Sequence, residues 1–132
     1  IIDDTYFKKD FNAAKLLGIV LTNAKLEFNG QCCYGVLDYD TWTGYIDDKK
    51  KMDGIIDNLR NISGVEIALF MYESDKGEYK VSLRSINKNV SSIATALGGG
   101  GHIRAAGATV YGRADELLKN TILPMIKKEL DG

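Results

Sequence analysis

Residues 98–107 read GGGGHIRAAG, four consecutive glycines followed by His102, the single histidine of the chain. Four glycines cost backbone entropy on folding, and the end of a helix needs only one. Glycines suit places where backbone N–H groups approach a ligand, and successive N–H groups form anion-binding nests. His102 can donate to a phosphate oxygen or carry a proton near neutral pH. Taken alone, a glycine run is more often a flexible loop and a single histidine is more often structural, so a phosphate-binding loop needs support from the residues around it.

The strand expected upstream supplies a basic group. Residues 79–85 (YKVSLRS) alternate apolar and polar residues, so one face is expected to be buried and the other polar. Arg84 lies on the polar face, where a guanidinium can bind phosphate bidentately or remain a solvated charge. Arg104 follows the glycines and is either part of the same site or a surface residue. Together these residues predict a phosphate pocket between a strand end and the glycine loop.

Hydrophobic periodicity predicts helices and strands in alternation. Steps of three and four predict a helix over residues 10–25, and an Asn29-Gly30 turn leads into a strand over 32–37. The later elements are a helix over 47–60, strands over 65–72 and 79–85 forming an antiparallel hairpin, a helix over 90–97, a strand over 105–111, and a helix over 114–130 that Pro124 kinks or interrupts. The predicted fold class is α/β, a mixed sheet of about four or five strands flanked by helices. We interpret residues 1–132 as one domain, with residues 1–28 forming an N-terminal helical arm packed on it.

Composition excludes several classes of protein. The 132 residues are 45% hydrophobic and 27% charged, which is typical of a globular domain rather than a disordered chain. Lys and Arg number 17 against 18 Asp and Glu, so non-specific coating of DNA or anionic membrane is not expected. No run of 18 apolar residues indicates a membrane span. The cysteines, Cys32 and Cys33, are adjacent and poorly placed to bridge, which predicts free thiols in a cytoplasmic protein.

Two further groups have a functional and a structural interpretation. Asp38 and Asp40 could share a strand face and bind a cation, but a solvated strand end is favoured. Trp42 and Tyr45 could stack a base, but packing is favoured.

Residues 98–107, with the upstream strand Lys80-Val81-Ser82-Leu83-Arg84-Ser85, resemble the DHH phosphoesterase superfamily. The C-terminal DHH-associated domain of that superfamily has a signature of a glycine run, His, two variable residues and Ala-Ala-Gly, and the ten-residue match is complete. The resemblance covers most of the chain and is clearest over residues 47–111. It is strongest to the oligoribonuclease and 3′-phosphoadenosine-5′-phosphate phosphatase branch, close to phosphodiesterases that cleave cyclic or linear dinucleotides.

The resemblance implies that this chain is the substrate-binding half of a two-domain hydrolase. In the family, an N-terminal domain holds two Mn²⁺ ions with Asp and His residues that include an Asp-His-His triplet. This sequence has one His and no such triplet, so we expect no metal site in it and no hydrolysis by it alone. The expected partners are short RNA or a nucleotide and the N-terminal DHH domain of the same polypeptide, with no membrane partner; a homodimer is left open.

Motif matching also suggests roles for individual residues. Gly99, Gly100 and Gly101 would let the loop approach the nucleotide. His102 would face a substrate phosphate with a catalytic role, and Arg84 would clamp a phosphate. Arg104 occupies a variable position of the motif, so its substrate-binding role has the weakest basis.

Two other functions compete with this one. The first is a tRNA-binding module, because alanyl-tRNA synthetases carry a related domain that typically lacks the histidine. The second is a free-standing nucleotide sensor, which a Met directly before Ile1 would favour and an upstream Asp-His-His would exclude. His102 and the balanced charge favour the phosphoesterase. The substrate stays open among oligoribonucleotides, cyclic or linear dinucleotides and 3′-phosphoadenosine-5′-phosphate.

Overall fold

A computed structural model describes the backbone of residues 4–132 and the side chains of residues 11–132. Within this range a six-stranded sheet has the order β1-β2-β3-β4-β6-β5. The strands are β1 (Lys25–Glu27), β2 (Cys32–Leu37), β3 (Ile67–Asp75), β4 (Glu78–Ser85), β5 (Gly100–His102) and β6 (Ala105–Tyr111). The β2–β3 pair is parallel and the other four pairs are antiparallel, so the sheet is mixed.

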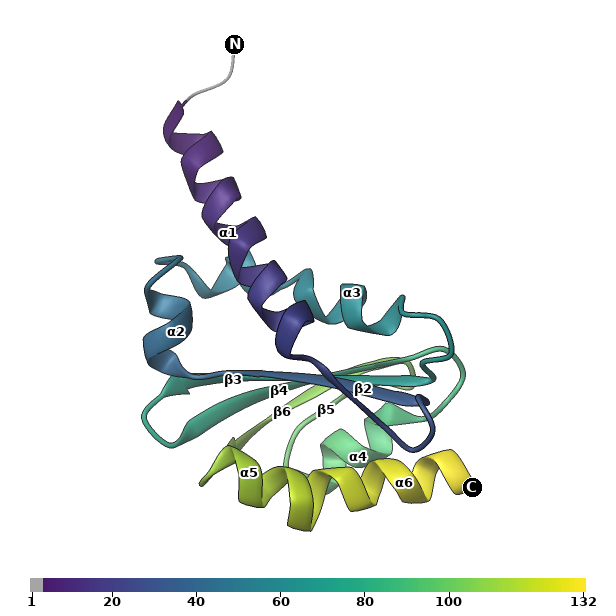
Figure 1. The fold of residues 1–132 in the computed structure, drawn as a ribbon. Helices are drawn as coiled ribbons and strands as arrows, with labels where there is room; N and C mark the ends of the chain where they lie inside the picture. The colour runs from purple at the N-terminus through teal and green to yellow at the C-terminus, as the bar shows by residue number, and fades with distance from the viewer. Residues whose placement is uncertain (1–3) are drawn as a thin grey trace.

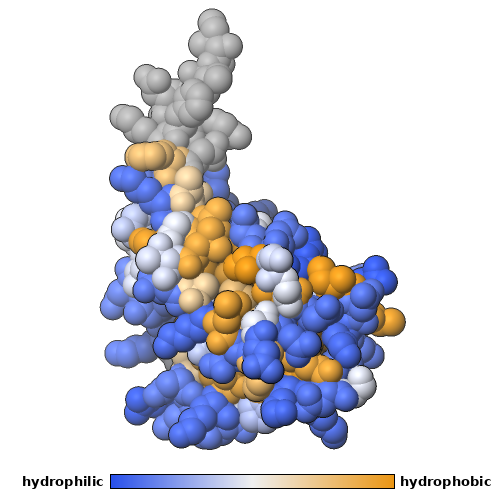
Figure 2. Space-filling view, turned by 45° about the vertical axis from the view of Figure 1, so that its right-hand side comes forward, coloured by the Kyte–Doolittle hydropathy of each residue, from blue (hydrophilic) through white to orange (hydrophobic). Residues whose placement is uncertain are grey.

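Helices cover both faces of this sheet (Figure 1). On one face lie α1 (Asp4–Asn23), α2 (Tyr39–Thr43), the 3-10 turn η1 (Lys49–Met52) and α3 (Ile55–Arg60). On the other face lie α4 (Val90–Ala96), α5 (Ala114–Leu117), the π-helical turn η2 (Leu118–Ile122) and α6 (Leu123–Asp131). The first half of α1 projects beyond the sheet (Figure 1). Apolar side chains gather near the base of this helix, whereas hydrophilic side chains cover much of the rest of that face (Figure 2).

The central strand β3 explains why the sheet needs two helical layers. Its residues are apolar from Ile67 to Met71 and all of these are buried. Ile67, Leu69 and Met71 belong to the core beneath α4 and α6, and Ala68 and Phe70 belong to the core beneath α1 and α3. A strand buried on both faces reads as a continuous apolar run, which is what the sequence has here.

The predicted α/β class and flanked mixed sheet are confirmed, with corrections to the elements. The sheet has six strands instead of four or five, because β1 and β5 are three residues long and too short to show alternation. The single helix expected over 47–60 is the turn η1 followed by α3, separated at Gly54. Helix α1 begins at Asp4, earlier than residue 10. Pro124 stands at the start of α6 directly after the π-helical turn, so the last helix is interrupted as expected.

The acidic candidates lie at the start of α2 and not at the expected strand end, whereas Trp42 packs in the core as expected. Asp38 caps α2 by accepting from the Thr41 N–H at 2.8 Å. Trp42 is buried and its indole N–H donates to the Glu73 carbonyl at 2.7 Å. Both cysteines are buried free thiols. In residues 4–132 no helix is long and apolar enough to cross a membrane.

Candidate functional site

The register of the sheet places Arg84 and His102 in one row. Arg84 of β4 is opposite Ala105 of β6, and Ala105 is opposite His102 of β5. Residues directly opposite each other in antiparallel strands have side chains on the same face. Adjacent strands lie about 4.8 Å apart, so the Cα atoms of Arg84 and His102 are roughly 10 Å apart with only a methyl side chain between them.

This half of the sheet is open on the α1–α3 side. The core beneath α1 and α3 contains residues of β2 and β3, whereas the buried apolar residues of β4 and β6 belong to the opposite core. The residues facing the open side are all partly exposed: Lys80, Ser82, Arg84, Ala105, Gly107 and Thr109. Most of them are small, and we call this surface, together with Gly100 and His102, the open face. A flat floor of short side chains with a guanidinium and an imidazole on it can receive an extended polar ligand.

Arg84 is oriented by two contacts. Its Nη1 donates to the Leu83 carbonyl at 3.0 Å, and its Nε lies 3.8 Å from Oδ1 of Asp57 on α3. Asp57 also pairs with Arg60 at 3.4 Å. The Nη2 group of Arg84 has no partner within the described residues, and 28% of the side chain is exposed, so donors remain available for an anion. The sequence analysis missed Asp57, because a single carboxylate on a helix carries no signal of which strand residue it faces.

A pocket of about 230 Å³ lies beside Arg84, on the side of β3. Phe70 and Ile56 are among its apolar walls, and Asp53, Ser82 and Tyr72 add polar groups. Burial raises the pKa of the Tyr72 hydroxyl, with smaller effects from Asp53 and Glu78. Neither the glycines nor His102 line this pocket. Arg84 therefore stands between a pocket and His102, and the single cleft expected around both residues is replaced by the shared open face.

His102 is exposed at the sheet edge. Within the described part of the chain its ring has no hydrogen bond or ion pair, so no structural contact occupies it. Arg104 lies in the β5–β6 turn, outside the row, with an exposed side chain. The structure thus brings Arg84 and His102 together and does not bring Arg104 into the row.

Three of the four glycines are required by the fold itself. Gly98 follows α4 with φ of +92°, a backbone conformation that ends helices and favours glycine. A Cβ on Gly99 would lie 2.1 Å from the Gly107 carbonyl oxygen. Gly101 has φ of +146°, and its Cβ would lie 2.6 Å from the Ala106 Cα. These requirements account for most of the glycine run without a ligand.

Gly100 is the exception. A Cβ there would meet nothing within 4 Å, and its φ is not positive. Gly100 is opposite Gly107, which is opposite Ser82, so the space above Gly100 is on the open face. Because Gly100 has no side chain, a ligand on the open face can approach the backbone beside His102.

The hairpin that carries the glycines is anchored at both ends. Gly98 and Gly99 donate their N–H groups to the Thr95 and Ala94 carbonyls at 3.0 and 2.8 Å. The expectation that the glycine N–H groups are free for an anion is therefore wrong for these two residues, because they complete the end of α4. At the turn, the carbonyls of Ile103 and Arg104 accept from the N–H groups of Val90 and Ser85.

The described residues offer no metal centre of their own. No group of three His, Cys, Asp or Glu side chains is close enough to hold an ion in the described range. The resemblance places Mn²⁺ in the N-terminal DHH domain, and the side chains described here provide no set of ligands for it.

Comparison with known proteins supplies the family. Residues 29–128 match the model of the DHHA1 domain. The chain belongs to the DHHA1 domain family. The DHHA1 domain is 32% identical over 117 residues to the bifunctional oligoribonuclease and PAP phosphatase NrnA of Thermus thermophilus, covering 88% of this chain and 34% of that protein. The suspected resemblance is thus confirmed, and this chain spans about a third of the length of the curated relatives it matches.

Solved structures share the fold of this DHHA1 domain. An exopolyphosphatase-related protein from Bacteroides fragilis superposes with a TM-score of 0.75 at 24% identity, covering 91% of this chain and 34% of that one. The C-Ala domain of Aquifex aeolicus alanyl-tRNA synthetase gives a TM-score of 0.58 at 15% identity, covering 82% of this chain and 99% of that one. At 24% and 15% identity the similarity shows a shared fold and nothing more. It therefore does not distinguish a phosphoesterase domain from a tRNA-binding domain.

Proposed function

We propose that this DHHA1 domain binds the phosphates of a short oligoribonucleotide, a dinucleotide or 3′-phosphoadenosine-5′-phosphate for a DHH-type phosphoesterase. The observation that carries the proposal is the row of Arg84, Ala105 and His102 on the open face. Arg84 would bind one phosphate through its free guanidinium edge, and His102 would contact the phosphate that is cleaved. The pocket beside Arg84 would take the part of the nucleotide next to the bound phosphate.

The division of labour follows from the donors that this chain has. A hydrolytic DHH domain elsewhere in the same polypeptide would supply the metal-activated water, since the described residues contain no ligand set for Mn²⁺. Arg84 and His102 would hold the substrate in line with that water from the opposite wall. Gly100 would let the nucleotide lie close to the backbone beside His102.

Substitutions in the full-length enzyme test this assignment. A charge-assisted bond from Arg84 to phosphate is worth about 1.5–3 kcal/mol, so Arg84→Ala should lower kcat/KM by about 10- to 100-fold. His102→Ala should act mainly on kcat, because an interaction that strengthens in the transition state appears there. Arg113→Ala is the matched control, since Arg113 is exposed, pairs with Asp115 and follows the opposite end of β6. A His102→Ala enzyme with normal turnover, or one that unfolds, would assign His102 a structural role instead.

The substrate class is identified by comparing the binding affinities of 3′-phosphoadenosine-5′-phosphate, linear dinucleotides, cyclic dinucleotides and a tRNA acceptor stem. The phosphoesterase proposal expects the small nucleotides to bind and Arg84→Ala to weaken them. Binding of tRNA alone, unaffected by Arg84→Ala, would favour the synthetase-like module.

A further inference from the structure

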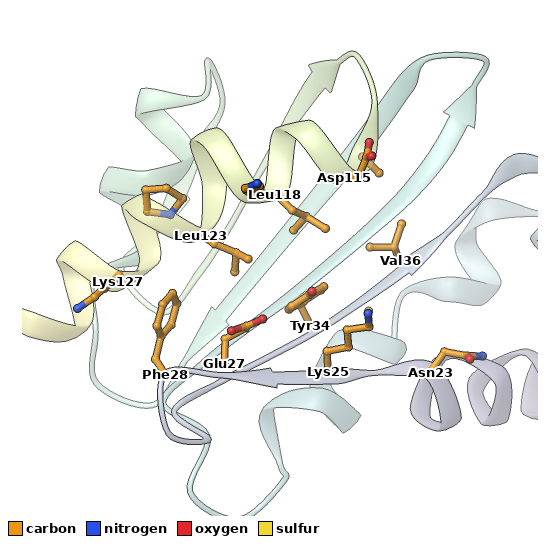
Figure 3. A pocket seen from close by; sticks show the side chains of 14 residues that line it. Asn23, Lys25, Glu27, Phe28, Tyr34, Val36, Asp115, Leu118, Leu123 and Lys127 are labelled. Atoms are coloured by element: carbon orange, nitrogen blue, oxygen red, sulfur yellow. The ribbon is translucent and has the colours of Figure 1, made fainter.

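A second, larger pocket lies on the sheet face opposite the open face. It has a volume of about 730 Å³ and lies between the β1–β2 hairpin and the α5–η2–α6 segment (Figure 3). Tyr34 and Val36 form its floor and pack against the core beneath α4 and α6, whereas the open face is on the α1–α3 side. Pockets of about 300–1,000 Å³ are the size that binds small molecules. The Arg84–His102 row contributes no residue to it.

Two aromatic rings line this pocket. Phe28 has φ of +57°, a conformation that is rare and costly for a bulky residue, and it precedes two further residues with positive φ. This backbone turns the Phe28 ring toward the pocket, where it faces the α6 segment (Figure 3). Tyr34 presents its ring from β2 (Figure 3). Phe28 and Tyr34 therefore provide apolar surfaces for a planar ring.

A carboxylate lies between the two rings. Glu27 extends from β1 into the space between Phe28 and Tyr34 (Figure 3). Burial raises the pKa of the Tyr34 hydroxyl, and the negative charge of Glu27 raises it further. Glu27 has no ion-pair partner among the described residues. It is free to accept a hydrogen bond from a ring amine.

The unpaired charges at the rim are mainly positive. Lys127 pairs with Asp131 at 2.9 Å and Asp115 pairs with Arg113 at 3.2 Å, so these two lining residues are neutralised. Lys25 and Lys119 line the pocket and have no partner within the described residues. Two free ammonium groups against the one carboxylate of Glu27 leave an excess of one positive charge. An anionic group of a ligand, bound at the rim, would neutralise this excess positive charge.

We propose that this pocket binds a mononucleotide, with the base against the Phe28 and Tyr34 rings, its amine on Glu27 and its phosphate on Lys25 and Lys119. The site is separate from the open face, and the inference does not rest on the function proposed for Arg84 and His102. A nucleotide bound there would contact both the β1–β2 hairpin and the π-helical turn.

The experiment titrates AMP into the Arg84→Ala protein, so that the open face does not contribute, and follows backbone amide shifts by NMR. Shifts over residues 25–36 and 114–127 are expected, with adenosine and ribose 5-phosphate each binding at least tenfold more weakly than AMP. Lys119→Glu should weaken AMP at least tenfold, and Lys128→Glu, an exposed lysine of the same segment that does not line the pocket, should change it less than twofold. Phe28→Gly removes the ring while keeping a residue that favours positive φ, and should weaken AMP at least fivefold.

Three results would overturn the proposal. They are AMP shifts confined to the open face, equal affinities of the Lys119→Glu and Lys128→Glu proteins, and ribose 5-phosphate binding as tightly as AMP. Because Arg84 is already absent, none of these results depends on the phosphate role proposed for it.

Discussion

Alanine at two neighbouring glycines should change stability in opposite directions. A Cβ on Gly99 would lie 2.1 Å from the Gly107 carbonyl oxygen and 2.7 Å from the Ala108 Cα. Both obstacles are backbone atoms that cannot rotate away, so Gly99→Ala should cost about 3 kcal/mol, the upper part of the overpacking range. For a chain of this size that corresponds to a fall in Tm of roughly 10 °C. Gly100→Ala meets no atom within 4 Å and should stabilise by about 0.4–1 kcal/mol, because it restricts the unfolded chain.

Thermal melts of the three proteins provide the test. Trp42 is the single tryptophan and is buried, so its fluorescence reports global unfolding beside far-ultraviolet circular dichroism. A Gly99→Ala protein within 2 °C of the parent, or a Gly100→Ala protein that falls as far as Gly99→Ala, would refute the assignment of the glycines. The same Gly100→Ala protein should bind substrate more weakly despite its stability. Unchanged substrate binding would show that no ligand approaches Gly100.

Three further outcomes are expected. Asp57→Ala should leave Tm within about 2 °C of the parent. Because it releases the Arg84 guanidinium, it should weaken the binding of a phosphate ligand about two- to fivefold, measured by titration calorimetry. Tighter binding would mean that Asp57 competes with the ligand for Arg84. The purified chain with added Mn²⁺ should release no mononucleotide from a dinucleotide, and chelator-sensitive hydrolysis would contradict this. Burial raises the pKa of the Cys32 thiol from 9.0 to about 12, so the stability from its protonated form is fully present below pH 9 and is lost as pH rises toward 12. Urea unfolding at pH 7.5 and 10.5 should show this loss, and Cys32→Ala should reduce it.

Sequence patterns identified the strands and helices in which one or both faces are buried, because burial leaves a regular pattern of apolar residues. The apolar run of β3 and the alternation of β4 were sufficient to place both strands, because burial dictates those residues. Strand β5 was missed, since Gly100, Gly101 and His102 have no apolar face and its pairing depends on a hairpin with β6. The segment after β2 was interpreted as a strand end, but Asp38 begins the short helix α2. Local spacing could not indicate this, because an Asp serves equally in both places.

The candidate site shows a similar division. Its motif pointed to Arg84, the glycines and His102, but not to their arrangement. That Ala105 separates Arg84 from His102 depends on the register of three strands, which no local pattern encodes. The glycines were interpreted as ligand contacts, whereas Gly99 and Gly101 are explained by the close approach of β5 to β6. Only a structure separates a glycine that makes room for a ligand from one that makes room for its neighbouring strand.

The anchoring of the glycine hairpin has a consequence for the entropy of binding. Ordering one residue costs about 1–2 kcal/mol, so ordering residues 98–102 at the moment of ligand binding would subtract roughly 5–10 kcal/mol from affinity. Here α4 and Ser85 hold the hairpin in place through the bonds to Gly98, Gly99 and the turn, so the ordering belongs to the folding reaction. A glycine-rich segment, usually the most flexible part of a chain, is thus a rigid surface before any ligand arrives. Ligands should therefore associate with it without a slow conformational step and with little change in its amide hydrogen exchange.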